Sequence, residues 1–114
     1  MANNFKSTGV SGISTAAGSP TVIYTANNGV GINSVVLEID VANTGTDRIF
    51  VTVLMSDSST GSTYHIIKDG QVPVGGTLQL IAGQKLVLNA DDTLQIYGSH
   101  ATADAIVSFL EDVA

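Results

Sequence analysis

Apolar and polar residues alternate along several short stretches of the chain, which is the pattern of β-strands that bury one face. The clearest stretch is 32–41, where the odd-numbered residues from Val35 to Val41 are apolar and Glu38 and Asp40 lie on the other face. Because acidic side chains face solvent, the odd-numbered face is predicted to line a core.

Seven more stretches of this kind are separated by turn-forming residues such as Asn27-Asn28-Gly29, Asp69-Gly70 and Asp91-Asp92. They cover residues 21–25, 48–57, 63–68, 74–80, 85–89, 93–97 and 103–111. Strands this short, with loops between them, are typical of antiparallel sandwiches and barrels. The predicted fold is therefore all-β, an antiparallel β-sandwich (jelly-roll-like or Ig-like) of about 7–9 short strands.

The same alternation predicts which side chains fill the core, because the apolar members of each strand share a face. The residues expected to be largely buried are Val35, Leu37, Ile39, Val51, Val53, Leu86, Leu88, Leu94, Ile96, Val107 and Phe109.

The start of the chain differs from this pattern. Residues 5–20 are rich in Ser, Thr, Gly and Ala, and Val10 and Ile13 are isolated apolar residues among them. Such a segment buries little apolar area for the backbone entropy that it loses on ordering. Residues 1–20 are therefore predicted to form an N-terminal arm, flexible or ordered by a partner, and residues 21–114 to form the sandwich domain.

Charge and composition exclude several classes of function. Ten acidic residues against four basic ones give a net charge of −6, whereas nucleic-acid and anionic-membrane surfaces need clustered Lys and Arg. Apolar runs are too short for a transmembrane helix, and the first residues do not resemble a secretory signal. The chain has no Cys, which excludes disulfides and thiolate chemistry.

No residue pattern points firmly to catalysis or to a cofactor. His65 and His100, with Asp91 or Asp92, have ligand types that suit a metal, but their spacing matches no metal motif. The two adjacent acids fit better as a turn whose side chains bond backbone amides.

Other chemical motifs are equally weak. No Gly-x-Ser-x-Gly elbow supports a Ser-His-Asp triad, and neither Gly29-x-Gly31 nor Gly75-Gly76 precedes a helix start. Three dispersed Tyr residues, Tyr24, Tyr64 and Tyr97, make a weak sugar-binding platform. We expect a protein that is not an enzyme and needs no cofactor or metal.

The second half of the chain carries a resemblance to a family. Val72-Pro73-Val74-Gly75-Gly76-Thr77-Leu78 is followed by Gly83-Gln84-Lys85-Leu86-Val87-Leu88, by Ala90-Asp91-Asp92-Thr93-Leu94-Gln95-Ile96 and by Ala105-Ile106-Val107-Ser108-Phe109-Leu110-Glu111. This succession resembles small β-sandwich virion proteins of tailed bacteriophages, and the resemblance covers about residues 20–112. Asp91 departs from it, because the pattern more often has Gly before the Asp.

The resemblance implies structural work in the virion. It suggests a capsid decoration (cement) protein, made in the host cytoplasm, that stabilises the shell through contacts with the major capsid protein or another virion protein. The alternatives are a tail, neck or fibre-base component of the virion, and a carbohydrate-binding module on a host-facing surface. We also expect a homo-oligomer, because exposed sheet edges favour association, and the resemblance implies a trimer ahead of a dimer.

Apolar residues outside the predicted core are the expected contacts with other subunits or with the capsid. These residues are Phe5, Val10, Ile13, Val36, Phe50, Leu78 and Leu80.

Overall fold

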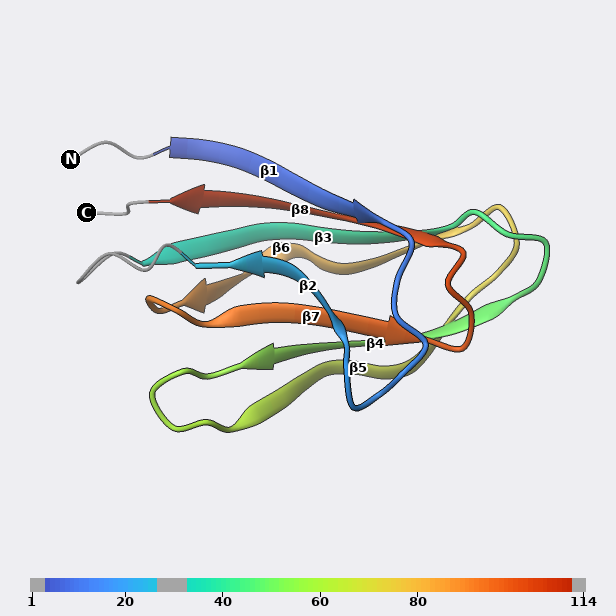
Figure 1. Cartoon of the computed structure of the whole chain (residues 1–114). Coiled ribbons are helices and arrows are strands. Elements are labelled where there is room, and N and C mark those ends of the chain that lie inside the picture. The colour runs from blue at the N-terminus through green and yellow to red at the C-terminus, as the bar shows by residue number, and fades with distance from the viewer. Residues whose placement is uncertain (1–3, 27–32, 112–114) are drawn as a thin grey trace.

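The chain folds into two antiparallel four-stranded sheets that pack face to face (Figure 1). A computed structural model describes residues 4–26 and 33–111. Sheet A has the strand order β1 (Asn4–Ser11), β8 (Ala103–Glu111), β3 (Ser34–Asn43) and β6 (Thr77–Leu88). Sheet B has the order β2 (Thr21–Thr25), β7 (Thr93–Gly98), β4 (Ile49–Ser56) and β5 (Thr63–Val72). The prediction of an all-β antiparallel sandwich is confirmed.

Two predicted strand boundaries are wrong. Asp69-Gly70 is not a turn, because β5 continues through it to Val72. The pairing of β5 with β4 shifts there, and Asp69, at φ 54°, donates its backbone N–H to the Thr52 hydroxyl at 3.1 Å. An Asp tolerates this left-handed conformation, so the pair makes a β-bulge. Residues 77–88 likewise form one strand, where two strands were predicted.

A bulge in β3 changes which side chains face the core. The pairing of β3 with both β6 and β8 shifts between Val36 and Glu38. One extra residue reverses the alternation, so Val36 on one side of the bulge and Ile39 on the other are both fully buried. Val35 and Leu37 are only half-buried, which corrects the prediction that they line the core.

The core lies between the sheets and contains most of the side chains that were predicted for it. The members of that set that are buried are Ile39, Val51, Val53, Leu88, Leu94, Ile96, Val107 and Phe109. Leu86 is half-buried and packs against this cluster. Ile13, Ile23, Tyr24 and Ile49 also belong to the core, although they were not among the residues predicted for it.

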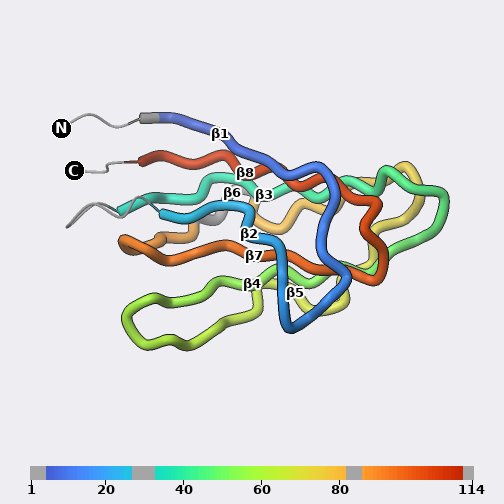
Figure 2. Tube along the Cα trace, viewed as in Figure 1, coloured from blue at the N-terminus to red at the C-terminus, as the bar shows by residue number. Residues whose placement is uncertain are grey.

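The N-terminal segment belongs to the sandwich, which differs from the predicted flexible or partner-ordered arm. Strand β1 pairs with β8 over eight residues, and the link from β1 to β2 then crosses from sheet A to sheet B (Figure 2). Along this link Ile13 is 6% exposed, and its backbone N–H donates to the Ala101 carbonyl at 3.1 Å. A strand at a sheet edge orders through backbone hydrogen bonds, so it needs few apolar side chains of its own.

Candidate interaction surface

An apolar row crosses the outer face of sheet A, the face turned away from sheet B. Cross-strand pairing aligns Phe5 of β1 with Leu110 of β8, Leu110 with Val35 of β3, and Val35 with Val87 of β6. Neighbouring strands are about 4.8 Å apart, so the row is about 14 Å long. Phe5 is 76% exposed and Val87 54% exposed. We call these four residues the apolar row.

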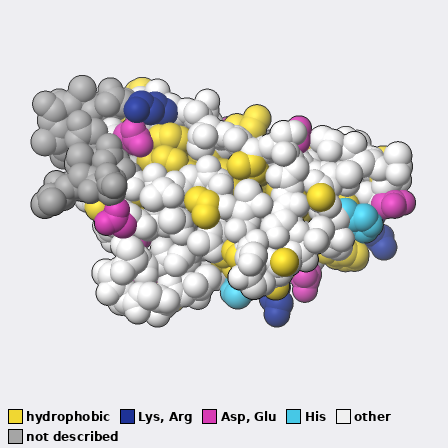
Figure 3. Space-filling model, viewed as in Figure 1, with side chains coloured by type: hydrophobic (Ala, Val, Ile, Leu, Met, Phe, Trp, Pro, Cys, Tyr) yellow, Lys and Arg dark blue, Asp and Glu magenta, His cyan; other side chains and the backbone are white. Residues whose placement is uncertain are grey.

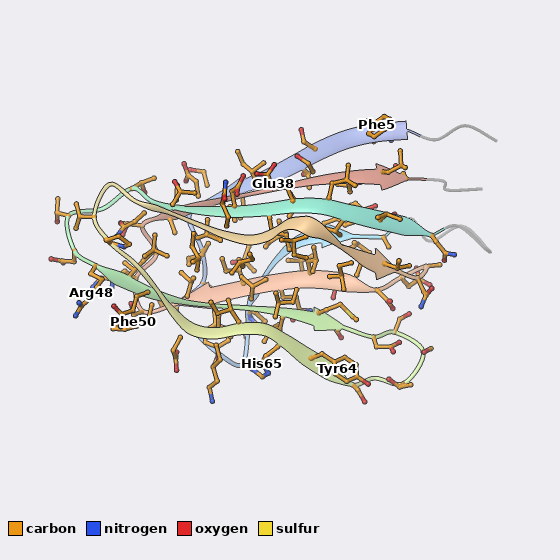
Figure 4. All side chains as sticks on the ribbon, turned by 180° about the vertical axis from the view of Figure 1, so that it is seen from behind. Phe5, Glu38, Arg48, Phe50, Tyr64 and His65 are labelled. Carbon is orange, nitrogen blue, oxygen red and sulfur yellow. The ribbon has the colours of Figure 1, made fainter. Side chains whose placement is uncertain are left out.

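An acidic patch lies beside the row on the same face. Glu38 and Asp40 lie next to the bulge of β3 and project from the outer face of sheet A. Ile106 of β8, which is 53% exposed, is the cross-strand partner of Asp40. The hydrogen bond that protonated Glu38 donates to Asp40, and the negative charge of Asp40, raise the pKa of Glu38 above its usual range. Phe5 and Glu38 lie on the same side of the molecule, away from sheet B (Figure 4).

An ion pair supports one end of the row from the inner side of sheet A. Lys6 follows Phe5 in β1 and Glu111 follows Leu110 in β8, and the Lys6 Nζ lies 2.9 Å from Glu111 Oε1. This hydrogen-bonded ion pair lowers the pKa of Glu111, more than partial burial raises it. The two side chains therefore hold β1 against β8 where Phe5 meets Leu110.

The seven predicted contact residues do not form one surface. Phe5 is the most exposed of them and belongs to the apolar row. Phe50 lies on the opposite side of the molecule, with the Arg48 guanidinium 5.6 Å from its ring centre (Figure 4). Val10, Leu78 and Leu80 are half-buried against the core.

Two of the seven are core residues in this fold. Val36 is fully buried and Ile13 nearly so. Neither side chain presents an area that another chain could contact.

The row itself was visible in part from the sequence. The alternation of 103–111 assigns Ile106 and Leu110 to the face opposite Val107, and Val87 falls opposite Leu88. Val35 could not be found in this way, because the bulge that turns it outward leaves no signal in the alternation.

The residues considered for metal binding are far apart along the strands. Asp91 and Asp92 precede β7 and His100 follows it, so they lie at opposite ends of that strand. His65 is exposed on β5 (Figure 4). Within residues 4–26 and 33–111, no three His, Asp or Glu side chains gather closely enough to hold a metal ion.

Asp92 instead organises a turn, as the sequence suggested. Its carboxylate accepts the backbone N–H of Ser58 at 2.9 Å and that of Asn89 at 3.0 Å, and its side chain is almost fully buried. It therefore joins the β4–β5 loop to the β6–β7 turn.

The remaining candidate sites were a sugar-binding platform of three Tyr residues and two glycine motifs. The three Tyr residues do not share a surface, because Tyr24 is buried and Tyr64 projects outward from β5. Of the two glycine motifs, Gly29-x-Gly31 lies outside the described residues. Gly75-Gly76 forms a turn in which Gly75 has φ 72° and the Gly76 N–H donates to the Pro73 carbonyl at 2.9 Å. That turn connects two strands and precedes no helix.

Comparison of the chain with protein-family models, with curated proteins and with solved structures finds no match. The part of the chain that the structure describes contains no helix long and apolar enough to cross a membrane.

Proposed function

We propose that the chain is a non-enzymatic structural protein of a phage virion, a capsid decoration protein that works through protein–protein contacts. The observation that carries the proposal is the apolar row on sheet A. A row of large apolar side chains that crosses a rigid sheet is suited to contact with another protein. The phage assignment comes from the resemblance of residues 20–112 to small virion sandwiches.

Two further features support structural work. The buried polar side chains of Asn43 and Asp92 are used to hold loops and strands together. Asn43, on β3 of sheet A, donates to the Val72 carbonyl on β5 of sheet B at 3.0 Å, so it ties the sheets to each other. The visible surface carries scattered apolar side chains and few charged ones (Figure 3).

Mass spectrometry of purified virus particles from a host that carries this sequence tests the proposal. A decoration protein should be present in on the order of hundreds of copies, since it repeats with the symmetry of the shell. A few to a few dozen copies would place the chain in the tail or neck. Absence from the particles would overturn the virion role, and a glycan array would then test the carbohydrate-binding alternative.

A matched pair of variants tests whether the apolar row makes the contact. Val87→Asp puts a charge into the row, and Val74→Asp puts the same charge on a residue that is 56% exposed in the β5–β6 turn. The first variant should bind particles at least tenfold more weakly than wild type. The second should bind as wild type does, and equal binding of both variants would remove the row from the proposal.

A further inference from the structure

The four edges of the two sheets are not equivalent. The edge strands are β1 and β6 in sheet A and β2 and β5 in sheet B. The pairings of β2, β5 and β6 with their neighbours each contain register shifts, and β5 also carries the exposed Lys68. Bulges and lysines are the devices by which proteins discourage pairing at an edge.

The edge of strand β1 that faces away from β8 is protected neither by a bulge nor by a lysine side chain. Its eight residues pair with β8 in an unbroken register, and among the described residues no strand pairs with its other side (Figure 1). The side chain of Lys6 is held by Glu111. Every second residue of β1 therefore directs its N–H and C=O toward an open edge, which is a template for another strand.

We infer that β1 pairs with β1 of a second copy of this chain, in antiparallel fashion about a two-fold axis, to form one continuous eight-stranded sheet. A two-fold axis perpendicular to the sheet keeps the outer faces of both copies on the same side. In such a pairing, the numbers of any two residues that lie opposite each other add up to the same even number. This sum defines the register. The inference does not rest on the virion role.

The three registers centred on Lys6, Ser7 and Thr8 bring different side chains together. A sum of 12 would set Lys6 directly opposite Lys6 of the second copy, which is unfavourable for like charges. A sum of 14 sets Ser7 opposite Ser7 and Phe5 opposite Gly9 of the second copy. A sum of 16 would leave the Phe5 ring beside the small Ser11 and set Gly9 opposite Ser7.

The register centred on Ser7 sets a large exposed ring opposite a residue that has no side chain. Gly9 has no side chain, and a Cβ there would lie 2.8 Å from the Ala105 carbonyl oxygen and 3.3 Å from Ile106 Cγ1, so a larger residue does not fit without a shift of its neighbours. Its neighbour on β8 is Ile106, which is 53% exposed. The Phe5 ring of the second copy would cover Gly9 and contact Ile106, an aromatic–glycine pairing that stabilises strand edges.

Substitution at Ser7 tests this pairing directly, since the axis passes beside it. In Ser7→Lys, two like charges face each other, and the dissociation constant of the dimer should rise at least tenfold. Thr63→Lys places the same charge on an exposed residue of edge strand β5 and should leave the dimer unchanged. Light scattering on the purified full-length chain at micromolar concentration measures both, with urea unfolding as the check that both variants are folded.

A cross-link gives the positive test. The chain has no Cys, so Ser7→Cys introduces a single thiol. Residues opposite each other in an antiparallel pair have Cα atoms about 4.5 or 5.5 Å apart, and both separations permit a disulfide. Mild oxidation should link Ser7→Cys into a dimer and leave Thr63→Cys monomeric in denaturing gels.

Several results would overturn the inference. These are a wild-type chain that is monomeric or trimeric in solution, a Ser7→Lys dimer as tight as wild type, and no cross-link in Ser7→Cys. None of these results bears on whether the chain is present in virus particles, so the two proposals fail separately.

Discussion

The hydroxyl of Tyr24 donates a hydrogen bond to Glu111 Oε2 at 2.8 Å, and so joins the edge strand β2 of sheet B to β8 of sheet A. The same hydroxyl lies 2.7 Å from the Ser34 Oγ on β3, and the other oxygen of Glu111 pairs with Lys6 on β1. The Tyr24 ring packs on Phe109 with the ring centres 4.0 Å apart. One polar network therefore holds four strands together at the end of the sandwich that carries the apolar row.

Removal of the Tyr24 hydroxyl should destabilise the fold while leaving the ring contact with Phe109 in place. Tyr24→Phe leaves Ser34 and Glu111 without this partner, which should cost about 1–3 kcal/mol of unfolding free energy. Tyr64→Phe removes a hydroxyl from a side chain that is 53% exposed and should change stability by less than about 0.5 kcal/mol. Urea unfolding compares the two, and equal losses would mean that the network contributes nothing.

Stability should fall in acid partly through Glu111. Its pKa is lowered in the folded chain, first by the hydrogen bond with Lys6 and also by the one from Tyr24. A lowered folded-state pKa gives stability that is present above the unfolded-state value of about 4.3 and is lost as the pH falls through the folded-state value. The stability difference between wild type and Glu111→Gln should therefore shrink from pH 6 to pH 3.

Glu38→Gln is the control for this loss of stability in acid, because the pKa of Glu38 is raised in the folded chain, whereas that of Glu111 is lowered. The hydrogen bond to Asp40 raises its folded-state pKa, so its contribution is present at low pH and is lost as the pH rises. The difference between wild type and this variant should change with pH in the opposite direction. Parallel pH profiles for the two variants would contradict the assignment of both carboxylates.

A second pH limit is expected in alkali. Burial raises the pKa of Tyr24 to about 12, with a further contribution from the charge of Glu111. The neutral hydroxyl therefore gives stability that is present below the unfolded-state pKa of about 10 and is lost as the pH rises toward 12. Unfolding measured between pH 9 and pH 12 should show this loss in wild type and less of it in Tyr24→Phe.

The bulge in β3 can be tested with two neighbouring valines. Val36 is fully buried and Val35 lies half-buried in the apolar row. Val36→Ala should cost about 2–3 kcal/mol, because it leaves a cavity in the core. Val35→Ala should cost less than about 1 kcal/mol. If Val35→Ala proved the more costly in denaturant unfolding, the strict alternation read from the sequence would be right and the bulge wrong.

These two valines also show where sequence reasoning succeeds and where it ends. Alternation identifies strands and their faces where the strand itself holds no extra residue, as in 93–98 and 103–111. A bulge adds one residue on one strand only, so its position depends on the partner strands. The reversal between Val36 and Ile39 follows from pairing with β6 and β8, which lie far away in the sequence.

Strand β1 was not predicted from the sequence for a related reason. Its composition is poor in apolar residues, and hydrophobic patterning detects only burial. What orders β1 is a set of backbone hydrogen bonds to β8 and the anchoring of Ile13 in the core. The apolar row could be predicted only in part, since no single strand contains more than one of its residues and the bulge in β3 conceals the place of Val35.

Asp92 offers the sharpest test of how a polar residue holds this fold together. Asp92 is almost fully buried, and Asp92→Ala leaves the partly buried backbone N–H groups of Ser58 and Asn89 without their acceptor. Loss of an acceptor for partly buried donors is costly, so the variant should lose about 1–3 kcal/mol of unfolding free energy. Asp91→Asn is the matched control, because Asp91 is exposed at φ 72° and Asn tolerates this left-handed backbone. It should unfold within about 0.5 kcal/mol of wild type, and a similar stability for both variants would show that the two loops hold together without the Asp92 carboxylate.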